Sequence, residues 1–190
     1  MTAKFAKGFT SLDREVEIDR LTVSGQAPRW LSGTLVRNGP GRFEVGQEQY
    51  RHWFDGLCML HRFSFKDGAV SYANRFLLSR DYKESTAKGR IVMSTFGTEP
   101  RRNLLQRLRQ ILSPEWSDNP SVNVGEIAGR HVAMTEVPPP LEFDIHSLKT
   151  LGPFDYGGDT LPGLVTTAHP HYDFDRAAFV NYTLQFGRVS

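Results

Sequence analysis

The feature that most constrains the fold is a succession of short apolar segments, each ended by a turn signal. Between residues 57 and 66, alternate positions place these side chains on one face of an extended strand: Leu57, Met59, His61, Phe63 and Phe65. Asp67-Gly68 then offers a hairpin turn, and the return strand is expected over residues 69–78. This pattern predicts an antiparallel pair of strands.

A second hairpin is predicted around the turn Ala128-Gly129. On its return strand, Val132, Met134 and Glu136 alternate onto one face. A carboxylate that alternates with two apolar residues is unusual, because burying a charge is costly unless it is paired. Glu136 therefore either turns to solvent or holds a specific partner, for example the second ring nitrogen of a metal-binding histidine.

Two later segments, LEFDIHSLKTLG and HYDFDRAAFVNYTLQF, repeat the order of apolar strand, polar turn and second strand. Short strands at this spacing are typical of an all-β sandwich, barrel or propeller, and their loose similarity suggests a structural repeat. The stretch Asn38-Gly39-Pro40-Gly41 is interpreted as a tight connection after a strand. It lacks the lysine and the hydroxyl residue of a phosphate loop, which argues against a nucleotide site.

One stretch departs from the β pattern. Between residues 98 and 119, apolar residues recur at helical spacing: Leu104, Leu105, Leu108, Ile111 and Leu112. Nearby arginines at positions 101, 102, 107 and 109 add positive charge, and Pro114 marks the expected end of the helix. Two interpretations stay open from the residues alone. The helix packs its leucines on the domain, which is the commoner case, or it lies in a membrane interface with its arginines at anionic headgroups.

Composition limits the classes of function. The 190 residues carry a net charge of +2, with 39% hydrophobic and 23% charged residues, which is typical of a globular domain and gives no sign of a nucleic-acid partner. The single cysteine, Cys58, cannot form an internal disulfide, which fits a reducing compartment. No signal peptide or apolar window long enough to span a membrane is apparent. We therefore expect a cytoplasmic protein.

The stretch LVTTAHPHYDF contains the first candidates for a metal site, His169 and His171. Residues two apart on a strand share a face, and Pro170 cannot donate to a sheet ladder, so the motif is expected at the end of a strand. Two imidazoles alone do not make a metal site, and hydrogen-bonded structural histidines are the alternative. His61, on an apolar strand, is expected to be a hydrogen-bonded core residue. The other histidines are expected at the surface or in turns: His52, His131 and His146.

Four segments in order resemble one family, the carotenoid cleavage oxygenases, which include apocarotenoid- and stilbene-cleaving enzymes and the vertebrate retinoid isomerase. The matching stretches are LSGTLVRNGPGRFEVG from Leu31, HWFDGLCMLHRFSFKDGAVSYANRFL from His52, NPSVNVGEIAGRHVAMTEV from Asn119, and TTAHPHYDF from Thr166. Together they cover nearly all of the chain. Any single one of these motifs would be weak, whereas four in family order are specific.

The resemblance implies an all-β fold, a seven-bladed β-propeller with Fe(II) on its axis held by four histidines. In that pattern His169 is the first iron ligand, whereas His171 and His61 are neighbours of the site. Glu136 matches a glutamate that orients another ligand histidine through its ring N–H. The helical segment falls where the family has an apolar, membrane-facing patch at the tunnel entrance. For the following residues, the resemblance therefore favours the membrane-interface interpretation: Leu104, Leu105, Leu108, Ile111 and Leu112.

The implied activity is the O2-dependent cleavage of a C=C bond in an apolar polyene, a carotenoid or apocarotenoid, to carbonyl products. A four-stranded blade takes about 40 to 45 residues, so we expect residues 1–190 to form about three blades of one N-terminal part of the propeller. The other three iron ligands are then absent, and the isolated chain is expected to be inactive. The alternatives are a non-catalytic fragment that binds a lipid surface or an apolar ligand, and a stilbene-cleaving dioxygenase.

Overall fold

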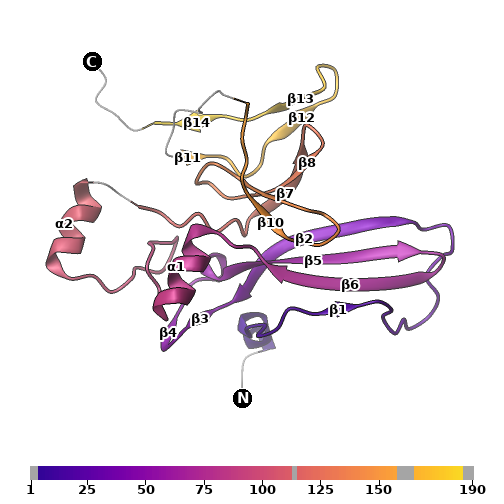
Figure 1. Cartoon of the computed structure of the whole chain (residues 1–190), viewed down its shortest axis with the longest axis horizontal. Helices are drawn as coiled ribbons and strands as arrows, with labels where there is room; N and C mark the ends of the chain where they lie inside the picture. The colour runs from indigo at the N-terminus through magenta and orange to yellow at the C-terminus, as the bar shows by residue number, and fades with distance from the viewer. Residues whose placement is uncertain (1–3, 113–114, 158–164, 186–190) are drawn as a thin grey trace.

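Two four-stranded antiparallel sheets form most of the structure (Figure 1), a computed structural model that describes residues 4–112, 115–157 and 165–185. The first sheet has the strand order β1 (Glu17–Ile18), β6 (Ala69–Phe76), β5 (Leu57–Lys66) and β2 (Gly33–Arg42). The second has the order β10 (Thr150–Pro153), β9 (Leu141–Phe143), β8 (Arg130–Met134) and β7 (Asn123–Ile127). Each sheet is thus built mainly from strands that are close in the sequence.

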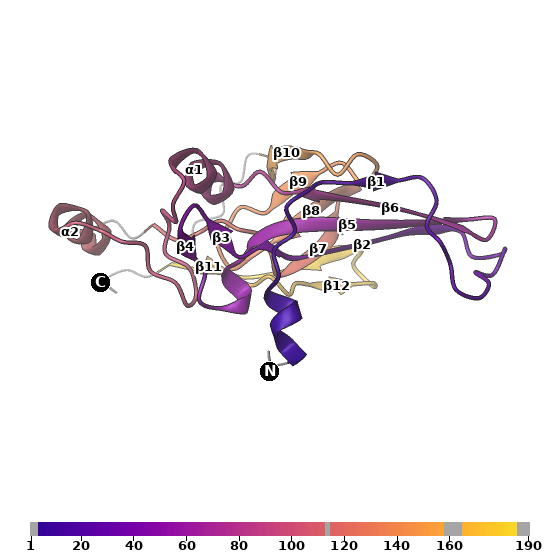
Figure 2. The same ribbon diagram turned by 90° about the horizontal axis from the view of Figure 1, so that it is seen from below.

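Three two-stranded ladders and four helical segments complete the described chain. The ladders pair β3 (Glu44–Val45) with β4 (Glu48–Gln49), β11 (Val165–Thr166) with β14 (Thr183–Leu184), and β12 (His171–Asp173) with β13 (Ala178–Val180). The helical segments are the 3-10 turns η1 (Lys4–Phe9) and η2 (Trp53–Asp55) and the α-helices α1 (Arg80–Lys88) and α2 (Leu104–Leu112). Helix α2 extends away from the sheets in both views (Figures 1 and 2).

Both predicted hairpins are confirmed. Asp67 and Gly68 join β5 to β6 with φ angles of 50° and 79°, and Ala128 and Gly129 join β7 to β8 with φ angles of 51° and 75°. Two successive positive φ angles are the geometry of the tight turn that matches the twist of paired strands. The two later strand pairs, β9 with β10 and β12 with β13, also form.

The expected connection at residues 38–41 is wrong, because these residues lie inside β2 and pair with β5. Pro40 is tolerated there since β2 is an edge strand, and a register shift between Pro40 and Arg42 accommodates the irregular backbone. A Cβ atom at Gly41 would lie 2.5 Å from Met59 Cβ. The glycine is therefore required for the close approach of two strands rather than for a turn.

The core lies where the two sheets meet. Its central cluster joins buried residues of the first sheet and its exit segment to residues of the second sheet and its loop: Cys58, Leu60, Ala73, Leu77, Ala133, Phe143 and Leu148. Leu57 belongs to another cluster on the opposite face of β5, with Val45, Tyr50 and Ile91. The first half of β5 is therefore covered on both faces, whereas the sequence pattern had indicated one.

Candidate functional site

A cavity of about 860 Å³ lies between the two sheets and the segment that carries α2. Its wall contains four parts: residues 37–40 of β2; the η2 turn; residues 94–96 with Trp116, Ser117, Asn119, Ser121 and Val122; and residues 135–137 with Val165 and His169. These parts come from both halves of the described chain. Only the tertiary fold brings them together.

Aromatic side chains form much of the cavity wall. The rings of Phe54 and Phe96 lie 5.8 Å apart, and the His52 ring lies 4.9 Å and 4.8 Å from them. Trp53 and Trp116 also line the cavity. The aromatic part of this wall suits a flat, apolar ligand, because binding there depends on the surface removed from water.

A buried carboxylate fixes one part of this wall. Asp55 is 1% exposed, and its oxygens accept hydrogen bonds from the Gly97 backbone N–H at 3.1 Å and from Thr98 Oγ1 at 2.6 Å. Gly97 has no room for a side chain, since a Cβ atom there would lie 2.6 Å from His52 Cβ. Asp55 and Gly97 therefore hold Phe96 beside Phe54.

His169 is exposed and lines the cavity. Its backbone is fixed by short-range and long-range contacts: its N–H donates to Thr167 Oγ1 at 3.1 Å, and Asn123 Nδ2 donates to the Ala168 carbonyl at 3.0 Å. Asn181 Nδ2 also donates to the Thr167 carbonyl at 3.0 Å. The HPH motif precedes and enters β12 at His171, so the expectation that it sits at a strand end is confirmed.

Glu136 lies beyond the end of β8 and is exposed, so it does not continue the alternation of Val132 and Met134. Its backbone carbonyl accepts the Thr166 N–H at 2.8 Å, and Thr135 Oγ1 donates to its carboxylate at 3.2 Å. Glu136 lines the same cavity as His169. The structure therefore brings together two of the residues that the sequence singled out.

The other two histidines named with the site do not line this cavity among the residues that the structure describes. His171 is exposed on β12. His61 is 5% exposed, and its Nδ1 lies 2.7 Å from Tyr72 Oη, as expected for a hydrogen-bonded core histidine. Burial, with a smaller contribution from Arg37, lowers the pKa of His61 to about 4, so this ring is neutral at pH 7.

A metal centre needs more ligands than these residues supply. In the part of the chain that the structure describes, no group of three or more His, Cys, Asp or Glu side chains is placed to hold a metal ion. His169 offers one exposed imidazole. The described residues thus fit one position of a ligand set and do not complete it.

Helix α2 exposes its apolar residues, with exposed fractions from 54% to 83%: Leu104, Leu105, Leu108, Ile111 and Leu112. No residue of this helix is buried, and Gln110 alone is half-buried. The interpretation in which the leucines pack on the domain is therefore wrong for this structure. The segments that flank α2 return to the cavity wall at Ser94 and Trp116, which form an isolated β-bridge.

Comparisons with known proteins agree on one family. The family model described as "Retinal pigment epithelial membrane protein" matches residues 9–190. A β,β-carotene 15,15′-dioxygenase of Rattus norvegicus is 40% identical over 166 residues, which cover 84% of this chain and 29% of the relative. A mitochondrial carotenoid-cleaving dioxygenase of Mustela putorius furo is 37% identical over 175 residues, covering 90% of this chain and 32% of the relative. The chain belongs to the carotenoid cleavage oxygenase family.

Solved structures of this family have the same fold over the shared region. A mutant of the Synechocystis apocarotenoid oxygenase matches with a TM-score of 0.77 and 29% identity, covering 87% of this chain and 34% of that protein. A cobalt-substituted form of the Synechocystis enzyme matches with a TM-score of 0.79 and 28% identity, covering 93% and 37%. The chain thus spans about a third of the length of the curated relatives it matches.

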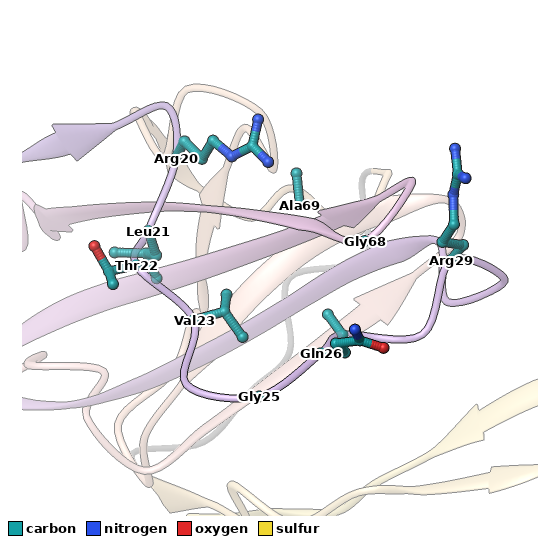
Figure 3. Close-up of a pocket in the computed structure, with 10 residues that line it drawn as sticks. Arg20, Leu21, Thr22, Val23, Gly25, Gln26, Arg29, Gly68 and Ala69 are labelled. Atoms are coloured by element: carbon teal, nitrogen blue, oxygen red, sulfur yellow. The ribbon is translucent and has the colours of Figure 1, made fainter.

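A second hollow lies under residues 20–29, beside the β5–β6 turn, with a volume of about 650 Å³ (Figure 3). Arg20 and Arg29 lie at its two ends, and much of the remaining lining is small residues. It contains no histidine, carboxylate or aromatic side chain among its lining residues. Its chemistry differs from that of the cavity that holds His169.

Sequence reasoning missed the aromatic part of the cavity that His169 lines. Phe54, Phe96 and Trp116 lie in segments without apolar periodicity, and their exposed fractions are 59%, 76% and 49%. The available signal was local: large aromatic residues in irregular segments, two of them close to a glycine. Aromatic residues in such segments are not needed for strand packing, and this makes them candidates for a binding surface.

Among the described residues, no helix has the length and apolar character needed to cross a membrane.

Proposed function

We propose that this chain contributes to an iron-dependent dioxygenase that cleaves a C=C bond of a carotenoid or apocarotenoid to two carbonyl products. The observation that carries the proposal is that His169 and Glu136 line one cavity with an aromatic wall. A polyene has almost no hydrogen-bonding groups, so such a wall provides most of its binding free energy. The relatives named as carotenoid dioxygenases support the same class of reaction.

His169 is proposed as one ligand of a ferrous ion, with its remaining ligands in parts of the full-length protein outside this sequence. The cobalt-substituted form of the related Synechocystis enzyme supports a metal centre in this family. When bound, ferrous iron supplies a position where O2 binds next to the substrate double bond. His169 is suited to this role because its imidazole is exposed to the cavity while its backbone is held by Thr167 and Asn123.

Glu136 is proposed to accept the ring N–H of another ligand histidine. A carboxylate in this position fixes the orientation of the imidazole and increases its basicity. Exposure of Glu136 to the cavity leaves its oxygens accessible, while the Thr166 N–H holds its backbone. His171 and His61 are not assigned as ligands.

The two four-stranded sheets are proposed to be consecutive blades of the family's seven-bladed propeller. Their likeness to the Synechocystis structures supports this assignment. In the same proposal, the segment with α2 is an amphipathic insertion at the cavity mouth that contacts a membrane surface. Exposed leucines next to arginines are the chemistry that an anionic lipid surface binds. The expected cytoplasmic location stays a prediction.

The metal assignment is tested by replacing each histidine of the HPH motif in the full-length protein that contains this segment. His169→Ala is expected to remove bound iron and the O2-dependent loss of polyene absorbance. His171→Ala, the matched control two residues away, is expected to retain most of the iron. Metal content is measured by mass spectrometry after identical purification, and equal loss in both variants would contradict the assignment. A stilbene substrate in the same assay decides between the two substrate classes.

A second candidate function is favoured by the outward apolar face of α2. In this alternative, the chain binds a lipid surface without catalysis. Flotation with vesicles of phosphatidylcholine and phosphatidylserine tests it: the parent chain is expected to float, whereas Leu104→Glu with Leu108→Glu is expected to remain in solution. Polyene cleavage by the full-length protein would reject the non-catalytic alternative and leave surface binding as part of the dioxygenase function.

A further inference from the structure

The orientation of α2 is the reverse of what apolar burial alone would give. At 100° per residue, the five apolar side chains lie on one side of the helix, and Gln106 and Gln110 lie on the other. The glutamine side faces the rest of the chain, because Gln110 alone is half-buried while every apolar residue of the helix is exposed. The hydrophobic effect favours the opposite rotation, so specific polar contacts must fix the observed one.

Gln110 of α2 and three residues that precede the helix supply those contacts. We call these four residues the polar latch: Ser94, Glu99, Arg102 and Gln110. Ser94 is 1% exposed, and its Oγ accepts Arg102 Nη2 at 2.7 Å and Gln110 Nε2 at 3.4 Å. The same hydroxyl donates to Glu99 Oε2 at 2.9 Å, and Arg102 Nη1 lies 2.6 Å from that carboxylate oxygen. The Arg102 side chain is 14% exposed, which is low for an arginine outside the core.

The polar latch also closes the base of the segment that carries α2. Gln110 Nε2 donates to the Glu115 carbonyl at 3.0 Å, and Gln110 Oε1 accepts the Glu115 N–H at 3.3 Å. Beyond Glu115, the Ser117 N–H donates to the Ser94 carbonyl at 2.9 Å. Ser94 and Ser117 both line the cavity. The contacts that orient the helix are therefore attached directly to the cavity wall.

Exposed apolar side chains lie on the cavity wall and on α2, and the contacts of Ser94 with Gln110 and Ser117 lie between them. Phe96 and Trp116, on the cavity wall, have exposed fractions of 76% and 49%, and Leu108, at the centre of the apolar face of α2, has an exposed fraction of 54%. If α2 were free to rotate, covering these aromatic residues with its leucines would remove apolar surface from water on both partners. Covering the cavity would require the segment to swing toward the sheets as well as the helix to rotate, because α2 extends away from them (Figures 1 and 2).

We propose that Arg102 and Gln110 are positioning residues that keep the apolar face of α2 turned outward and thereby prevent the helix from covering the cavity. This inference rests on the proposed interfacial function and deepens it. An anionic lipid surface then meets a preformed apolar face, and an apolar substrate meets an open cavity mouth. Arg102 acts through Ser94 and Glu99 and does not itself contact the substrate.

Thiol labelling measures the orientation of the helix without lipid. Leu108→Cys places a reactive thiol on the apolar face of the 190-residue chain. The native Cys58 is fully buried, and burial raises its pKa to about 12, so it serves as an unreactive reference. Adding Arg102→Gln is expected to slow maleimide labelling of the new thiol by about tenfold, because it then reacts only from a minor outward population. Arg107→Gln, which removes the same charge from the exposed side of α2, is expected to leave the rate unchanged.

The proposal would be overturned if the Leu108→Cys thiol were labelled as fast or faster with Arg102→Gln than without it. An equal rate would mean that Arg102 does not orient the helix, and a faster rate would mean that the polar latch only keeps the helix folded. If Arg102→Gln exposes Cys58 to the reagent, Gln110→Ala replaces it, with slower labelling again expected. Vesicle flotation then tests the polar latch separately from the proposed binding of the chain to a lipid surface. Weaker binding of Arg102→Gln than of Arg107→Gln supports the latch, and equal binding contradicts it. Failure of the parent chain to float would reject the interfacial function, while the labelling rates still decide the orientation.

Discussion

The two α-helices of this chain have the same length and opposite relations to the core. Helix α1, with the sequence RDYKESTAK, is polar and yet buries Asp81 and Ser85 completely. Helix α2, with the sequence LLQRLRQIL, has an apolar face and yet buries none of its residues. A helix is therefore not oriented by its hydrophobicity alone, because specific polar contacts can fix either face against the chain.

The contacts of α1 explain how a polar helix is held. Ser79 Oγ accepts the Tyr82 N–H at 3.0 Å, and the Asp118 carboxylate accepts the N–H groups of Arg80 and Asp81 at 2.8 and 2.9 Å. Asp81 in turn accepts hydrogen bonds from the hydroxyls of Ser85 and Ser117. Each contact satisfies a group that would otherwise be buried without a partner or left free at the helix start.

The largest expected effect in this comparison is that of removing the buried carboxylate of α1. Asp81→Ala leaves the hydroxyls of Ser85 and Ser117 without their acceptor and should lower the free energy of unfolding by about 3 kcal/mol. Urea denaturation measures this change. Glu84→Ala on the exposed side of the same helix is the control and should cost at most about 0.5 kcal/mol, because its pair with Lys88 is exposed. Similar losses in both variants would contradict the assigned role of Asp81.

The pH dependence of stability gives the next test of the buried carboxylate. Burial raises the pKa of Asp81 in the folded chain, although hydrogen bonds from Ser117 and Ser85 oppose the shift. The folded state therefore holds this proton more tightly than the unfolded state, whose pKa is about 3.9. The contribution to stability is fully present below that value and is lost as the pH rises through the folded pKa.

Asp81→Asn removes this titration, so its stability relative to the parent chain should increase between pH 4 and neutrality. The measurement is a series of urea titrations over about pH 4 to 7. A constant difference between the two chains over this range would show that Asp81 titrates as in the unfolded state.

Removal of the helix caps should have a smaller effect that again differs between the helices. Ser79→Ala removes the cap of α1 and should reduce global stability by about 1 kcal/mol. In α2, Asn103 Oδ1 accepts the Gln106 N–H at 2.9 Å and Gln106 Oε1 accepts the Asn103 N–H at 3.0 Å. Asn103→Ala should accelerate amide exchange within residues 104–112 without changing the global unfolding midpoint, because α2 adds little to the core. A shift of the midpoint would place α2 inside the cooperative unit.

The smallest expected effect is that of truncating an apolar side chain of α2. Leu105 is 77% exposed, so Leu105→Ala should change the free energy of unfolding by less than about 0.5 kcal/mol. Leu60→Ala, at a fully buried position of β5, is the matched control and should cost about 2 to 5 kcal/mol. A comparable loss at Leu105 would mean that the apolar face of α2 packs on the chain in solution.

The hairpins and the helix at residues 104–112 could be predicted because their signals are local. A turn such as Asp67-Gly68 is encoded by the φ angles of two residues, and a helix by a periodicity within about three turns. The position of the HPH motif at the start of a strand follows from Pro170 in the same way. The role expected for His169 came from the resemblance of four ordered segments and not from spacing, since two histidines alone are compatible with a structural role.

Other features depended on contacts between segments far apart in the sequence. Asn38-Gly39-Pro40-Gly41 has the composition of a turn, yet pairing with β5 and the close approach of Met59 place it inside a strand. Glu136 has the position of a strand residue, yet it lies past the end of β8 on a cavity wall. In both cases a long-range contact outweighs the local preference of the backbone.

The sequence by itself determined the antiparallel strand pairs, the helix at residues 104–112 and the family, because turn dihedrals, periodicity and ordered motifs are each encoded within short stretches. The tertiary structure alone decided that Phe54, Phe96, Glu136 and His169 share one cavity, and which polar contacts hold α2 with its leucines outward. The physical reason is that a periodic pattern defines the apolar face of a helix but not the surface against which that face packs. The packing of that face is fixed by buried polar groups such as Ser94, whose hydrogen bonds to Arg102 and Gln110 form only when the segment folds back on itself.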